Sequence, residues 1–133
     1  MLPEPYRLHH HADFSQAVRR GHRIGRRDLV VHCYASELDY RSQLTNPGTR
    51  LPESMLVTRG ARFGLIVSKA VGNAVIRHRV ARRLRHVCAT LAATVPDGTD
   101  VVIRALPGAA TASSDDLAQQ VRAALSKLQV VPR

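Results

Sequence analysis

Ten consecutive residues, Arg77–His86, combine five arginines and two histidines with apolar residues at helical spacing. A guanidinium group can donate two parallel hydrogen bonds to the oxygens of one phosphate. A surface with several arginines is therefore suited to binding a polyanion. The run lies within residues 54–96, which contain eight Lys or Arg and no Asp or Glu. These residue types therefore predict binding of nucleic-acid phosphate.

The positive charge of the chain is concentrated in this segment. The net charge is +10 over 133 residues. It divides into +2 for residues 1–53 (8 basic, 6 acidic), +8 for residues 54–96 and 0 for residues 97–133 (4 basic, 4 acidic). Focused positive charge favours nucleic acid first and an anionic membrane surface second. With no long apolar run and no signal peptide at its start, the chain is expected to be cytoplasmic, with no membrane partner.

A helix running from Asn73 to about residue 93 would separate the apolar and basic residues of this segment. At about 100° per residue, its apolar positions fall within a stripe of about 80°. These positions are Ile76, Val80, Leu84, Val87 and Leu91. The opposite arc of about 120° holds His78, Arg79, Arg82, Arg85 and His86, with Arg77 and Arg83 at its flanks. A solvated charged face is the alternative, but such faces mix signs, and like charges three or four residues apart destabilise a helix.

The elements around this helix predict one α+β domain spanning residues 1–133. Apolar spacing and turn residues indicate the order α-β-β-β-α-β-α, a sandwich of helices on a small mixed sheet. The predicted elements are a helix over 12–20 ended by a left-handed Gly21, a short strand near His22–Arg26, strands Leu29–Ala35, Arg62–Ser68 and Asp100–Ala105, and a last helix capped by Ser114. Residues 36–61 are predicted to form a long loop.

No catalytic or metal-binding constellation is evident. Three adjacent histidines, His9–His11, point in different directions on any regular element and rarely converge on one ion. The ten acidic residues are scattered, mainly where helix capping explains them. Cys33 and Cys88 lie in apolar runs and are expected to be buried, reduced thiols. The residues therefore predict a binding protein with no catalytic groups of its own.

The stretch Arg62-Phe-Gly-Leu-Ile-Val-Ser-Lys-Ala-Val-Gly-Asn-Ala-Val-Ile-Arg-His-Arg-Val-Ala-Arg-Arg-Leu-Arg85 closely resembles a family signature. The bacterial ribonuclease P protein subunit carries R-x-G-x-x-V-S-K-K-x-G-N-A-V-x-R-N-R-x-K-R-x-x-R. The resemblance extends to Ala12-Asp-Phe14 with the following Arg19-Arg-Gly21, and to Asp100–Leu106 with Pro107. Three positions depart from the signature, namely Ala70, His78 and Ala81.

This resemblance implies a fold, a partner and two surfaces. The fold contains an unusual left-handed βαβ crossover, contrary to the usual handedness rule. In that family a catalytic RNA subunit uses Mg²⁺ to remove the 5′ leader from precursor tRNA, and the protein binds both the RNA subunit and the leader. The activity is thus an endoribonuclease activity of the holoenzyme, with no catalytic residue in the protein.

The resemblance implies which residues form each surface, because they occupy the positions that have these roles in the family. The RNA-facing residues are Arg62, Ser68, Lys69, Asn73, Arg77, His78, Arg79, Arg82, Arg83 and Arg85. The leader-binding residues are Phe14, Val18 and His32, the last two replacing what are often aromatics. Phe14 can stack on a splayed base whatever the leader sequence, although plain core packing would also suit it.

Two other functions fit the charge. A basic structural protein of the ribosome would have the same composition, and only the signature around Arg77 separates the two. A helix-turn-helix DNA-binding protein is disfavoured, because no short partner helix precedes the basic one.

Overall fold

The computed structural model describes residues 2, 6–9, 11–35 and 61–128. Its elements are α1 (His11–Arg20), β1 (His22–Gly25), β2 (Leu29–Ala35), β3 (Arg62–Ile66), α3 (Ala74–Leu91), β4 (Thr99–Ala105), the short 3₁₀ helix η3 (Pro107–Ala110) and α4 (Ser114–Lys127). Apart from η3, which was not predicted, they match the predicted elements in kind and order, and their ends agree within two residues. The loop predicted for residues 36–61 lies almost wholly outside the described residues.

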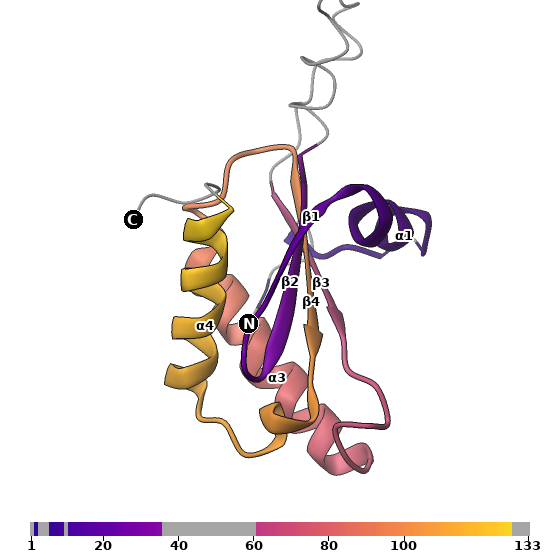
Figure 1. The fold of residues 1–133 in the computed structure, drawn as a ribbon, viewed down its shortest axis with the longest axis vertical. Helices are drawn as coiled ribbons and strands as arrows, with labels where there is room; N and C mark the ends of the chain where they lie inside the picture. The colour runs from indigo at the N-terminus through magenta and orange to yellow at the C-terminus, as the bar shows by residue number, and fades with distance from the viewer. Residues whose placement is uncertain (1, 3–5, 10, 36–60, 129–133) are drawn as a thin grey trace, which may run out of the picture.

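The four strands form one mixed sheet in the order β1-β2-β4-β3 (Figure 1). β2 is antiparallel to both β1 and β4, whereas β3 is parallel to β4. Since consecutive parallel strands need a crossover, α3 must leave the end of β3 and return the chain to the start of β4. The α+β class and the mixed sheet are confirmed; the left-handed sense of the crossover stays a prediction.

Helices cover both faces of this sheet (Figure 1). Strand residues alternate between faces, so Leu29, Val31 and Cys33 of β2 join the main core with α3 and α4. Tyr34 of β2 and Val102 of β4 point the other way and form a smaller cluster with Ala17 and Phe14 of α1. The sheet therefore has one face under two long helices and a second face that α1 covers.

The central helix α3 has the predicted apolar stripe. Asn73 caps it, since its side-chain oxygen accepts a hydrogen bond from the Ile76 N–H at 3.0 Å. The buried residues are Val80, Leu84, Val87, Cys88 and Leu91, with Ile76 partly buried beside them. Burial of this stripe against the sheet stabilises the helix, because packing rather than propensity supplies most helix stability in proteins.

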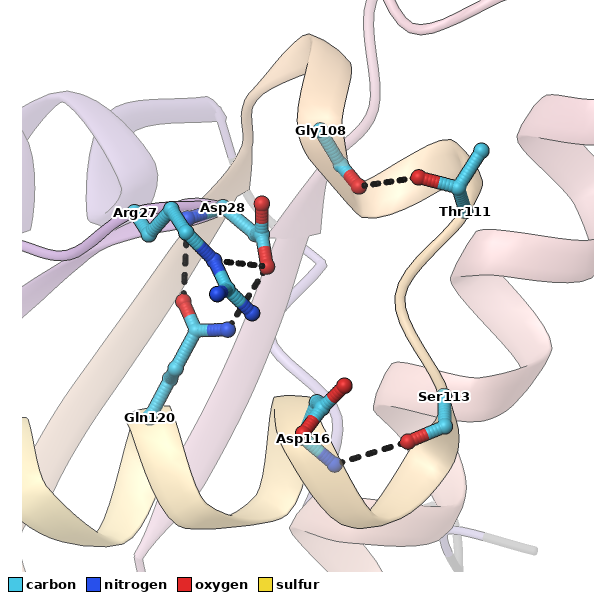
Figure 2. Close-up of polar contacts among 7 residues, drawn as sticks. All are labelled: Arg27, Asp28, Gly108, Thr111, Ser113, Asp116 and Gln120. Atoms are coloured by element: carbon cyan, nitrogen blue, oxygen red, sulfur yellow. Dashed lines mark hydrogen bonds and ion pairs between the residues drawn. The ribbon is translucent and has the colours of Figure 1, made fainter.

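Helix α4 is capped by Ser113, one residue earlier than predicted. The Ser113 hydroxyl oxygen accepts a hydrogen bond from the Asp116 N–H at 3.1 Å (Figure 2). Ser113 has an extended backbone (φ −73°, ψ 163°), which lets its side chain turn back over the first helical turn. Ser114 already belongs to the helix and has no such reach.

A buried carboxylate fixes α4 to the turn between β1 and β2. Asp28 is 4% exposed, and one of its oxygens accepts a hydrogen bond from the Gln120 side-chain amide at 2.7 Å (Figure 2). The Gln120 oxygen accepts in return from the Asp28 backbone N–H at 2.9 Å. The Leu106 N–H donates to the Asp28 carbonyl, so the same residue also holds the end of β4.

Gly21 does not have the predicted left-handed backbone; among the described glycines only Gly72 and Gly98 have positive φ. A glycine is needed at this position because a side chain would have no room. A Cβ at this position would contact the Ala17 carbonyl oxygen and lie 2.6 Å from the Cys33 carbonyl oxygen. The prediction was wrong because Gly21 is needed to leave room beside the last turn of α1 and beside Cys33 of β2, and not to adopt a left-handed backbone.

Candidate nucleic-acid interface

The basic arc of α3 faces away from the core. His78, Arg79, Arg82 and His86 are exposed, while Arg77, Arg83 and Arg85 are half-buried beside the apolar stripe. Ser68, Lys69 and Asn73 are exposed in the turn before the helix. Within the described part of the chain, no ion pair to a carboxylate is found for any arginine of this arc. The structure thus brings most of the predicted RNA-facing residues onto one continuous surface.

A groove of about 660 Å³ runs between α3, β3 and the N-terminal segment. Five basic residues and no acidic residue line it, namely Arg7, His9, Arg77, His78 and Arg85. Arg7 and His9 were not predicted to belong to the site. They reach it because residue 7 bridges to Phe63 in parallel, and the Leu8 N–H donates to the Phe63 carbonyl at 2.8 Å.

A second groove of about 620 Å³ lies between α3 and the start of α4. Arg79, Arg82, Arg83 and His86 line it together with Ser114. One guanidinium nitrogen of Arg83 donates to the Ala112 carbonyl at 2.8 Å, which ties α3 to the loop before α4. Arg83 therefore has a structural contact as well as a place in this groove.

Helix α1 and the sheet enclose a smaller cleft of about 270 Å³. Phe14 and Val18 line it, as do Ile66 of β3 and Arg19. The Phe14 ring lies so close to Gly64 that a Cβ on residue 64 would contact it. The structure brings Phe14 and Val18 together and adds Ile66, which no local sequence signal marked.

The third predicted leader-binding residue, His32, is not part of this lining. It is 1% exposed, and neither ring nitrogen has a hydrogen-bond partner among the described residues. Burial lowers its pKa, and the nearby positive charges of Arg104 and Arg23 lower it further. Both effects oppose the charged form, so His32 is neutral in the free protein at neutral pH.

Arg62 differs from the other predicted RNA-facing residues because carboxylates already occupy its guanidinium. Asp100 accepts two hydrogen bonds from it, each at 2.9 Å, and Asp13 of α1 accepts a third at 3.3 Å. Burial disfavours the charged guanidinium, but attraction to Asp100 and Asp13 outweighs this effect and raises the pKa of Arg62. Arg62 therefore links α1, β3 and β4, and its predicted contact with RNA stays a prediction.

Nothing in the described residues suggests covalent or metal chemistry. Cys33 and Cys88 are buried and free, as predicted. Burial raises the pKa of each thiol to about 12, so the nucleophilic thiolate is scarce at neutral pH. The described residues contain no group of three or more His, Cys, Asp or Glu that could hold a metal ion. None of the described helices is long and apolar enough to span a membrane.

Comparison with known proteins gives one consistent family. The family model described as Ribonuclease P matches residues 2–129. A ribonuclease P protein component from Nocardia farcinica is 64% identical, with 99% of this chain and 86% of that protein covered. The component from Corynebacterium diphtheriae is 46% identical, with 96% and 97% covered.

Two solved structures that are similar to this fold are ribonuclease P proteins. The ribonuclease P protein of Staphylococcus aureus matches with a TM-score of 0.72 at 21% identity, over 95% of this chain and 97% of that one. The protein from Thermotoga maritima matches with a TM-score of 0.62 at 16% identity, over 88% and 92%. At these identities the structures support the fold alone.

The Arg62 link predicts a stability difference between two substitutions. Arg62→Gln leaves the carboxylate of Asp100, which is 1% exposed, without its ionic partner and should lower the free energy of unfolding by about 3 kcal/mol. Asp13→Asn removes only the longer, more exposed contact and should cost about 1 kcal/mol or less. Urea unfolding of both variants measures this. Equal losses of unfolding free energy in the two variants would contradict the assignment of Asp100 as the main partner of Arg62.

Proposed function

This chain belongs to the ribonuclease P protein family, and from that premise we propose which of its surfaces bind RNA. Ribonuclease P cleaves precursor tRNA, and this protein is its RNA-binding subunit. We assign the basic arc of α3 and the two grooves beside it to the catalytic RNA subunit. The cleft between α1 and the sheet is assigned to the 5′ leader of precursor tRNA.

One observation carries the first assignment. The α3 helix buries its apolar stripe, while Arg79 and Arg82 on the opposite arc are exposed and have no ion pair with a described residue. Several uncompensated arginines on one helix repel each other, and phosphate relieves that repulsion. The A-form backbone of a folded RNA offers phosphates in rows, which suits two grooves lined by basic residues on the same helix.

The second assignment depends on the α1 cleft. It combines one aromatic ring, two aliphatic side chains and a flanking arginine, namely Phe14, Val18, Ile66 and Arg19. Aromatic rings stack on any base, and nearby cations hold the backbone, so such a cleft binds single strands with little sequence preference. Leaders of different precursor tRNAs differ in sequence, and this kind of binding tolerates the variation.

The chemistry is assigned to the RNA. The ribonucleoprotein is dependent on Mg²⁺, and we place the metal ions and the hydrolytic step on the RNA subunit. The described residues contain no group of side chains that fits a metal site, so we assign no metal ligand to this chain. We further infer that the protein works in the cytoplasm. Family membership decides between this function and the ribosomal or DNA-binding alternatives.

The purified protein alone should not cleave precursor tRNA, because the residues that the structure describes contain no acid–base or metal constellation. Activity should appear when the cognate RNA subunit and Mg²⁺ are added. The assay compares protein, RNA subunit and reconstituted holoenzyme on one labelled precursor. Cleavage by RNA-free protein that survives ribonuclease pretreatment would overturn the proposal.

Arg82→Ala and Arg85→Ala should each weaken binding to the RNA subunit. Each lost phosphate contact should reduce the slope of log affinity against log salt by about one unit. Filter binding over a salt series measures this slope, with Arg122→Ala as the control, since Arg122 is an exposed arginine of α4. An unchanged slope with a lowered melting temperature would make these two residues structural.

Phe14→Ala should lower affinity for leader-bearing tRNA more than for mature tRNA, by ~1–3 kcal/mol if the ring stacks on a base. Because the ring also packs on Gly64, Phe14→Leu serves as the matched variant that keeps apolar packing and loses stacking. Holoenzyme binding of both tRNAs is measured. Full leader affinity in Phe14→Leu would show that the ring only fills the core.

A further inference from the structure

His78 lies on α3 between the two basic grooves. Among the described residues, it alone lines both of them. In the first groove its neighbours are Ala74 and Ala81, about one helical turn before and after it, and their small side chains leave space beside the imidazole. In the second groove its neighbours are Arg79 and Arg82. Because His78 is exposed, phosphates bound in either groove can reach its ring.

The protonation state of an imidazole decides how many phosphates it can bind. A neutral ring has one N–H donor, and its second nitrogen is an acceptor that repels a phosphate oxygen. A protonated ring has two N–H donors that point in different directions, and it carries a positive charge. Contact of His78 with phosphates in both grooves at once therefore requires the protonated form. His9 and His86 each line a single groove, and one neutral N–H is enough for a contact there.

The protein supplies no negative charge at this place. His78 has no hydrogen-bond or ion-pair partner among the described residues. The first turn of α4 contains Asp115 and Asp116, but only Ser114 before them lines the second groove. The other titratable side chains that line the two grooves are all basic, namely Arg7, His9, Arg77, Arg79, Arg82, Arg83, Arg85 and His86.

The neighbouring elements do not change this balance. Lys69, in the turn before α3, adds a further positive charge. On β3, Arg62 is bound by Asp100 and Asp13, so those two carboxylates are already paired. Phosphates of an RNA in the grooves would bring the missing negative charge, and a nearby negative charge favours the protonated imidazole.

The residue type makes this contact a property of the present chain. The family signature has asparagine where this chain has His78. An asparagine amide stays neutral at every pH at which the protein is folded, whereas the charge of a histidine changes between about pH 5 and pH 8. Only the histidine can couple RNA binding to a proton.

We propose that His78 takes up one proton when the RNA subunit binds, and that its imidazolium then donates hydrogen bonds to phosphate oxygens in both grooves. The inference rests on the proposed function, because it takes phosphates of the RNA subunit to lie in these grooves. The complex then holds one more proton than the free components, so affinity rises as the pH falls, by at most about tenfold per pH unit. Between about pH 8 and about pH 6 the expected gain is roughly fivefold to tenfold.

The first test measures the affinity of the full chain for its cognate RNA subunit by filter binding over this pH range, at constant salt and Mg²⁺. His78→Asn should keep the weaker affinity of the wild type at about pH 8 and vary little with pH. His78→Arg is always charged and has several donors, so it should have the tighter affinity throughout. The matched control is His86→Asn, which changes an exposed histidine of the same helix that lines one groove.

His86→Asn should keep most of the wild-type pH dependence. Full pH dependence in His78→Asn, or its loss in His86→Asn alone, would overturn the assignment to His78. Melting temperatures at both ends of the pH range check that the variants fold, which is expected because His78 is exposed. If His78→Asn is destabilised, the comparison of His78→Arg with the wild type still decides the question.

The salt dependence of binding gives a second measurement. A protonated His78 adds one cation to the phosphate contacts, so the wild-type slope of log affinity against log salt should be steeper at about pH 6 than at about pH 8, by up to about 0.9. His78→Asn should have the same slope at both pH values. Equal wild-type slopes at the two pH values would contradict the proton uptake.

The outcomes separate this inference from the function on which it rests. If the wild-type chain binds its RNA subunit no better than an unrelated RNA of the same length, the proposed function fails. If it prefers the RNA subunit and its affinity does not change with pH, or changes equally in His78→Asn, only the role of His78 fails.

Discussion

The ion pair between Arg62 and Asp100 is the interaction on which the arrangement of the site depends. It joins the parallel strands β3 and β4 through two hydrogen bonds, and the same guanidinium reaches Asp13 of α1. A carboxylate as buried as Asp100 needs a charged partner, so the link is an obligatory part of the fold. The contact with Asp13 also ties α1, the helix that carries Phe14, to the sheet.

Helix α3 contributes to the core and also carries the proposed RNA interface. Its apolar stripe packs on the sheet, and the 3.6-residue period then places the arginines on the opposite side. The Arg83 hydrogen bond to the Ala112 carbonyl and the Asn73 cap each restrain the helix. The exposed arginines therefore project from a rigid helix. A rigid helix lowers the conformational entropy that is lost when the arginines bind phosphate.

The two surfaces that we propose to bind RNA are joined through the groove beside β3. That groove is lined by Phe14, which also borders the α1 cleft, and by Arg77 and Arg85 of α3. A leader in the cleft and a phosphate of the RNA subunit on α3 would therefore lie close together. This proximity suits the proposed function of holding the substrate against the catalytic RNA, since positioning lowers the entropic part of a reaction barrier.

Local patterns in the sequence determined the order of elements, the apolar stripe of α3, the buried cysteines and, through the signature at Arg62–Arg85, the family. Those features depend on periodicity and on neighbours within a few residues, which sequence displays directly. Tertiary structure alone decided that Arg62 is bound by partners 38 and 49 residues away, and that Arg7 and His9 join the groove. It also decided that Gly21 is required by Cys33 and that His32 is buried between two arginines. The partner of a charged side chain is set by the register and packing of distant strands, and no local pattern encodes that choice.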